Sequence, residues 1–177
     1  YEISTRDWSS DVCSSDLKLR EKHFSTREFL RHELSHALIS QNTSVRSSIG
    51  LLKLPWLFEG MAVSFGRQHD YLSREEFLSR AQTTELAEYI DPARVNVGGP
   101  NWNARFAYPA QRYFVEYLRE RFGEARFLDF LHRFVADPGR SAEIFTEAFE
   151  RPLPQAVAEY QQALRAPSGA GQWSPKD

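Results

Sequence analysis

Apolar side chains recur at every third or fourth position through most of residues 26–164, and this spacing is typical of helices that bury one face. Alternating strand patterns are nearly absent, and no internal repeat or linker divides residues 18–165. The segments predicted to be helical are 26–39, 55–65, 73–89, a helix that stops at Gly123, 127–135, 141–149 and 154–164. Residues 41–50 and 91–104 are predicted to be loops. The sequence therefore predicts a mainly α fold with one domain over residues 18–165.

Composition excludes several classes of protein. The 177 residues carry 22 basic and 24 acidic side chains, so no excess of positive charge points to nucleic acid as a partner. No apolar run approaches 18 residues, which argues against a transmembrane segment. A single cysteine cannot form an internal disulfide. Aromatic residues make up 14% of the chain, too many for a disordered protein.

The first 17 residues have an unusual sequence. YEISTRDWSSDVCSSDL resembles a translated sequencing-library adapter, so we interpret residues 1–17 as adapter-derived and disordered. Cys13 lies there and is therefore not a site residue. We expect the natural gene to have been cut upstream of Lys18, so that a signal peptide or an N-terminal subdomain is missing. The sequence therefore does not distinguish a cytoplasmic protein from an exported or membrane-tethered one. Residues 166–177 are rich in Gly, Ser and Pro and are predicted to be a disordered tail.

The first predicted helix contains His32, Glu33 and His36 in an HExxH pattern. At about 100° per residue the two imidazoles leave the same face of the helix, and Glu33 lies beside them. The apolar residues on the opposite side, expected to dock on the core, are Leu30, Leu34, Ala37 and Leu38. Two neutral imidazoles at this spacing suit Zn²⁺, and a catalytic zinc takes a third protein ligand and leaves one position open for water.

The third ligand distinguishes the classes of HExxH protein. A metzincin would need Gly at position 39 and His at position 42, where this chain has Ile39 and Asn42. A cysteine ligand, as in peptide deformylases, is excluded because the single cysteine falls in the adapter-like stretch. The downstream helix LPWLFEGMA instead offers Glu59, which we expect to project toward the HExxH helix. Gly60 and Ala62 are small, and we expect them to let these two helices approach closely.

An HExxH helix followed by LPWLFEGMA resembles the gluzincin metallopeptidases, most closely the peptidase-MA-like domains of bacteria, and is more distantly similar to the catalytic core of zinc aminopeptidases. The resemblance covers most of residues 26–164, including AYPAQRYFVEYL and the closing AFERPLPQAVAEYQQAL. Such domains usually carry Gly where this chain has Glu150, a difference that we expect to affect packing rather than chemistry. The resemblance implies a zincin-like helical catalytic domain whose upstream β-sheet subdomain has been truncated.

The resemblance also implies roles for individual residues. It implies one zinc ion per chain, held by His32, His36 and Glu59. Glu33 would be the general base on a water activated by the metal, and Tyr108 would donate a hydrogen bond to the transition-state oxyanion. Tyr113 is the alternative candidate if Tyr108 only packs at the start of a helix.

The predicted function is zinc-dependent hydrolysis of peptide bonds, with a peptide or protein as substrate. The alternatives are an inactive zinc-stabilised binding or scaffold domain of the same fold, and a zinc hydrolase that acts on another bond. The presence of Glu33 favours catalysis, because a degenerate member would be expected to lose its base before its ligands. Exopeptidase and endopeptidase activity both stay open, as does the oligomeric state.

Overall fold

The computed structural model describes residues 25–41, 43–67, 71–100, 102–166, 173 and 175. The helices in chain order are α2 (Thr26–Gln41), α3 (Val45–Leu52), α4 (Pro55–Gly66), α5 (Arg74–Ala81), α6 (Ala87–Ile90), α7 (Ala104–Phe122), α8 (Glu124–Ala136), α9 (Ser141–Phe149) and α10 (Leu153–Arg165), with a 3₁₀ turn at Pro138–Arg140. The prediction of a mainly α fold is confirmed, since these ranges contain no β-strand. Residues 1–17 lie outside the described part of the chain.

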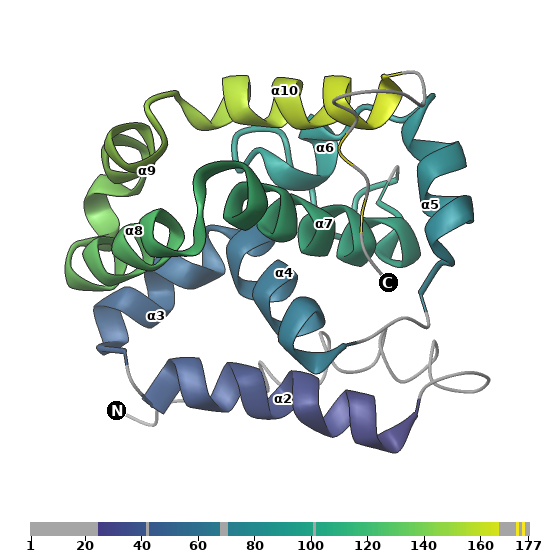
Figure 1. Ribbon diagram of the computed structural model, residues 1–177. Helices are drawn as coiled ribbons and strands as arrows, with labels where there is room; N and C mark the ends of the chain where they lie inside the picture. The colour runs from purple at the N-terminus through teal and green to yellow at the C-terminus, as the bar shows by residue number, and fades with distance from the viewer. Residues whose placement is uncertain are drawn as a thin grey trace.

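Helices α4 and α7 pack along each other in the centre, with α2 and α10 at opposite ends of the molecule (Figure 1). Gly60 of α4 permits this contact, because a β-carbon there would stand 2.6 Å from the carbonyl oxygen of Gln111 on α7. The prediction that Gly60 serves the approach of α4 to the HExxH helix is therefore wrong. Gly60 serves the α4–α7 contact instead.

Aromatic side chains fill the core between α4 and the C-terminal helices. The fully buried Trp56 of α4 contacts three rings at centroid distances between 5.1 and 6.2 Å, those of Phe114, Phe130 and Phe145. Burial of large aromatic side chains is a major contribution to stability, and edge-to-face contacts such as those of Trp56 with Phe114 and Phe145 add to it. This core fixes the start of α4 and so positions the residues that follow Trp56.

Two parts of the predicted helix pattern are wrong. Residues 45–50 fall in the predicted loop 41–50, but they form most of α3. Gly50 of this helix fits so closely on Pro138 that a β-carbon there would stand 2.4 Å from the proline side chain. The helix predicted over 73–89 ends at Ala81, and a separate short helix, α6, follows. The Ser73–Glu76 capping box at its start is present as expected.

The apolar side of α2 does not dock on the core of the described chain, contrary to expectation. Leu30, Leu34 and Leu38 are 53%, 58% and 59% exposed, whereas His32 on the other side is buried. The helix thus packs on α4 through the face that carries its histidines. This arrangement brings the two imidazoles to an interface between helices rather than to an open surface.

Part of the C-terminal segment also contacts the helices. Trp173 packs on Tyr117 and Tyr160 at centroid distances of 5.5 and 5.6 Å, and its indole N–H donates to Glu120 over 2.7 Å. The carbonyl oxygen of Pro175 accepts a hydrogen bond from Arg74. The rest of residues 167–177, predicted to be a disordered tail, lies outside the described ranges. No described helix is both long enough and apolar enough to cross a bilayer.

Candidate metal centre

The two helices that carry the HExxH pattern and Glu59 meet at a glycine. Gly66 ends α4 and stands two helical turns beyond Glu59, so both residues lie on the face of α4 that meets α2. A β-carbon at Gly66 would stand 3.2 Å from the backbone nitrogen of His32. The missing side chain therefore allows α4 to approach α2 closely at the position of the first histidine. The left-handed residue that terminates α4 is Arg67, with φ 52°.

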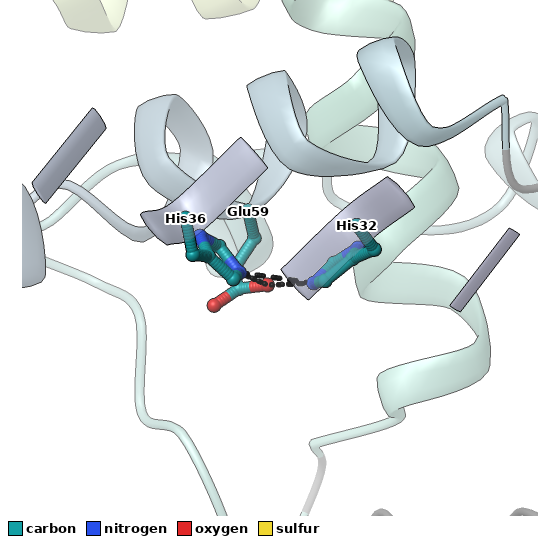
Figure 2. Close-up of side chains that lie close together, drawn as sticks. All are labelled: His32, His36 and Glu59. Atoms are coloured by element: carbon teal, nitrogen blue, oxygen red, sulfur yellow. Dashed lines mark hydrogen bonds and ion pairs between the residues drawn. The ribbon is translucent and has the colours of Figure 1, made fainter. Parts of the chain in front are cut away.

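His32 and His36 from α2 and Glu59 from α4 converge on one point (Figure 2). The Oε2 atom of Glu59 lies 3.4 Å from Nε2 of His32 and 3.5 Å from Nε2 of His36. The two Nε2 atoms lie 2.9 Å apart. These side chains are buried or half-buried: that of His32 is 9% exposed, that of His36 17% and that of Glu59 27%. These three side chains, brought together as the sequence predicted, could hold a metal ion.

Two of the three distances between donor atoms fit a tetrahedral metal site. Zinc bonds of about 2.0–2.1 Å to nitrogen and oxygen place neighbouring ligand atoms about 3.3 Å apart at tetrahedral angles. The two distances to Glu59 Oε2, 3.4 and 3.5 Å, lie close to this value. The distance of 2.9 Å between the imidazoles is that of a hydrogen bond between the rings. Two imidazoles and one carboxylate form a donor set that suits zinc.

The histidines stabilise the ionised form of the Glu59 carboxyl. Burial raises the pKa of this group, but hydrogen bonds and charge attraction with His32 and His36 outweigh it and lower the pKa from 4.5 to about 2. Glu59 therefore carries its negative charge at neutral pH, as a metal ligand must.

Aromatic rings surround the two imidazoles. The ring of Phe58 is stacked on that of His36, with the centroids 4.0 Å apart and the planes at 26°. The ring of Tyr108 lies edge to face with His32 at 6.4 Å, and Tyr71 packs on Tyr108 at 4.7 Å. The sequence did not point to Phe58 or Tyr71, because aromatic residues are common in this chain and nothing in their spacing relates them to the histidines.

The remaining predicted residues lie in different surroundings. Glu33 is exposed on α2, immediately after His32. Tyr108 is half-buried in the second turn of α7 and contacts His32, whereas Tyr113 is buried in the core against Phe77 at 4.8 Å. Of the two tyrosines suggested by the sequence, Tyr108 is the one that this structure brings to the histidines.

Comparisons of this chain with models of protein families, with curated proteins and with solved structures found no match. The candidate site is therefore defined by its own geometry. The described part of the chain brings two imidazoles and a carboxylate together at a helix interface, in a group that could bind a metal ion.

Proposed function

We propose that this chain is a zinc-dependent peptidase of the gluzincin type, in which a metal held by His32, His36 and Glu59 activates water and Glu33 is the general base. The observation that carries the proposal is the convergence of these three donors within 4.8 Å of one another. The order of the residues in HExxH supports the proposal further. The exposed Glu33 directly follows the ligand His32 and is not one of the three metal donors, so its carboxylate can serve as the base. The zincin-like fold is part of the same proposal.

The side chains of this site have separable tasks. Zinc, when bound, supplies a Lewis acid that polarises a carbonyl group and favours deprotonation of water. The imidazoles provide neutral nitrogen donors, and the ionised Glu59 reduces the net charge of the site. The carboxylate of Glu33 accepts the proton of the attacking water and then passes it to the nitrogen of the leaving amine. The Tyr108 hydroxyl, on the ring next to His32, donates to the carbonyl oxygen as negative charge develops there.

The test compares the metal content of the protein with its activity. Protein purified with zinc should carry about one ion per chain and hydrolyse members of a peptide library. Replacing the base by its amide, Glu33→Gln, should keep the zinc and lower the rate about 10²–10⁴-fold. Glu75→Gln, the same change at an exposed position on α5, is the matched control and should leave both properties unchanged.

The other outcomes separate the alternatives. Zinc-loaded protein that cleaves no peptide and no other hydrolysable substrate would support a zinc-stabilised binding domain. Turnover of non-peptide substrates alone would support a different hydrolase. Failure to bind zinc at all would overturn the proposal.

A further inference from the structure

We propose that Phe58 is a positioning residue for the metal centre, and that its ring holds the His36 imidazole in the orientation in which Nε2 faces Glu59 and His32. The inference rests on the proposed function, because it concerns how one metal ligand is oriented. Its basis is the stacked contact between the two rings, 4.0 Å between centroids and 26° between planes. Phe58 would act through His36 and would not touch metal or substrate.

An imidazole needs such a restraint. The torsion that turns a histidine ring about its Cβ–Cγ bond is broad, so the backbone of α2 alone does not fix the direction of Nε2. In most metal sites the second ring nitrogen donates a hydrogen bond that fixes the ring. The Nδ1 atom of His36 is buried and has no hydrogen-bond partner among the described residues. A ring packed on the face of the imidazole restricts the same rotation.

Helix α4 supplies both contacts to His36. Phe58 and Glu59 are consecutive residues, so their side chains leave the helix about 100° apart. The carboxylate meets the edge of the imidazole, where Oε2 lies 3.5 Å from Nε2, while the phenyl ring covers its face. A single helix therefore fixes both the position of the nitrogen and the plane of the ring.

His32 is held differently, so the effect of Phe58 should be local. The backbone of His32 lies against Gly66, its ring lies edge to face with Tyr108, and its side chain is 9% exposed compared with 17% for His36. The Nδ1 atom of His32 likewise has no partner among the described residues, but loss of the Phe58 ring leaves the contacts of His32 with Gly66 and Tyr108 in place, so His36 should be released more than His32. This asymmetry gives the inference a specific spectroscopic consequence.

The experiment replaces the ring by an aliphatic side chain. Phe58→Leu should weaken zinc binding, measured by calorimetric titration of the metal-free full chain, about tenfold, the lower end of the loss seen when a ligand loses its orienting partner. Phe58→Tyr keeps an aromatic ring on the face of the imidazole, so it should bind zinc within about twofold of wild type. Only removal of the orienting partner should produce a loss of about tenfold or more. Phe65→Leu, the same change at an exposed phenylalanine of α4, is the matched control and should have no effect.

A second measurement does not require metal. Nuclear magnetic resonance of the metal-free protein should show the ring protons of His36 shifting more than those of His32 in Phe58→Leu. The ring stacked on His36 is lost, whereas His32 senses the change only through its contact with His36. Helical circular dichroism and thermal unfolding establish that the variant is folded. Wild type that binds zinc together with a Phe58→Leu variant that binds it equally well would overturn the positioning role and leave the proposed function intact. Wild type that binds no zinc would overturn both.

Discussion

Gly66 and His32 lie in direct contact at the crossing of α4 and α2, where a β-carbon on the glycine would stand within 3.4 Å of three atoms of the histidine, N, Cα and Cβ. The contact lets α4 pass close to the histidine face of α2. Glu59 lies on the same face of α4, two turns earlier, and so reaches both imidazoles. The candidate metal centre thus depends on a residue that has no side chain and takes no part in chemistry.

The two glycines of α4 should differ in their tolerance of a methyl group. At Gly60 a β-carbon would meet a backbone oxygen at 2.6 Å, a distance that only a shift of α4 or α7 can relieve. We expect Gly60→Ala to lower the free energy of unfolding of the metal-free protein by about 1–3 kcal/mol, the usual cost of overpacking. Gly66→Ala, whose nearest contact is 3.2 Å, should cost less. Urea unfolding measures both, and a larger loss for Gly66→Ala would contradict the prediction.

The charge of Glu59 should make stability depend on pH in acid. Its pKa is lowered from 4.5 to about 2, so the ionised carboxylate stabilises the native state fully above about pH 4.5 and loses this contribution as the pH falls toward 2. The stability difference between wild type and Glu59→Gln, measured without metal, should therefore be greatest near neutral pH and shrink in acid. A difference that stays constant between about pH 6 and about pH 3 would contradict this assignment.

Much of the helix pattern could be predicted because local information specifies it. Pro55 at the first position of α4 and the capping box of Ser73 with Glu76 are local features, and both are in place. The two histidines share a face for the same reason, since a spacing of four residues fixes their direction on any helix. The contact of these histidines with Glu59 depends on how α2 and α4 cross. Local sequence patterns do not specify this crossing, and Glu59 was assigned as a ligand from the resemblance.

The errors of prediction come from contacts between distant segments. The helix α3 forms in a serine-rich stretch, where Gly50 packs on Pro138, 88 positions further along the chain. The stacking of Phe58 on His36 also results from the crossing of α4 and α2, and the spacing of apolar residues along the sequence does not predict it. Local preference cannot reveal such contacts, because tertiary packing overrides weak propensities.

Metal binding should stabilise the native state. A ligand that binds only the native protein at a free concentration a hundredfold above its dissociation constant adds about 2.7 kcal/mol to the free energy of unfolding. We expect zinc to raise the thermal midpoint, a chelator to reverse the rise, and His36→Ala to lose most of it. His132→Ala, which removes an exposed histidine from α8, is the control and should keep the full rise. Equal rises in the two variants would exclude His36 as a ligand.

The exposed leucines of α2 should contribute little to the stability of this chain. Leu34 is 58% exposed, whereas Leu118 on α7 is fully buried. We expect Leu34→Ala to change the free energy of unfolding by no more than about 0.5 kcal/mol, and Leu118→Ala to lower it by about 2–5 kcal/mol. Chemical denaturation of the two variants gives the comparison. A large loss for Leu34→Ala would mean that this face of α2 is covered in solution.

Glu150 ends α9 with a left-handed backbone, φ 59°, so a glycine at this position would relieve backbone strain. The left-handed region costs a residue with a β-carbon about 1–2 kcal/mol. Glu150→Gly should therefore stabilise the protein by about 1 kcal/mol, although it loses an exposed ion pair with Arg126, 3.0 Å long, that contributes little. Glu150→Ala loses the same ion pair but keeps the β-carbon, so it should be no more stable than wild type. If urea unfolding found the two variants equally stable, the left-handed backbone at Glu150 would not cost the protein stability.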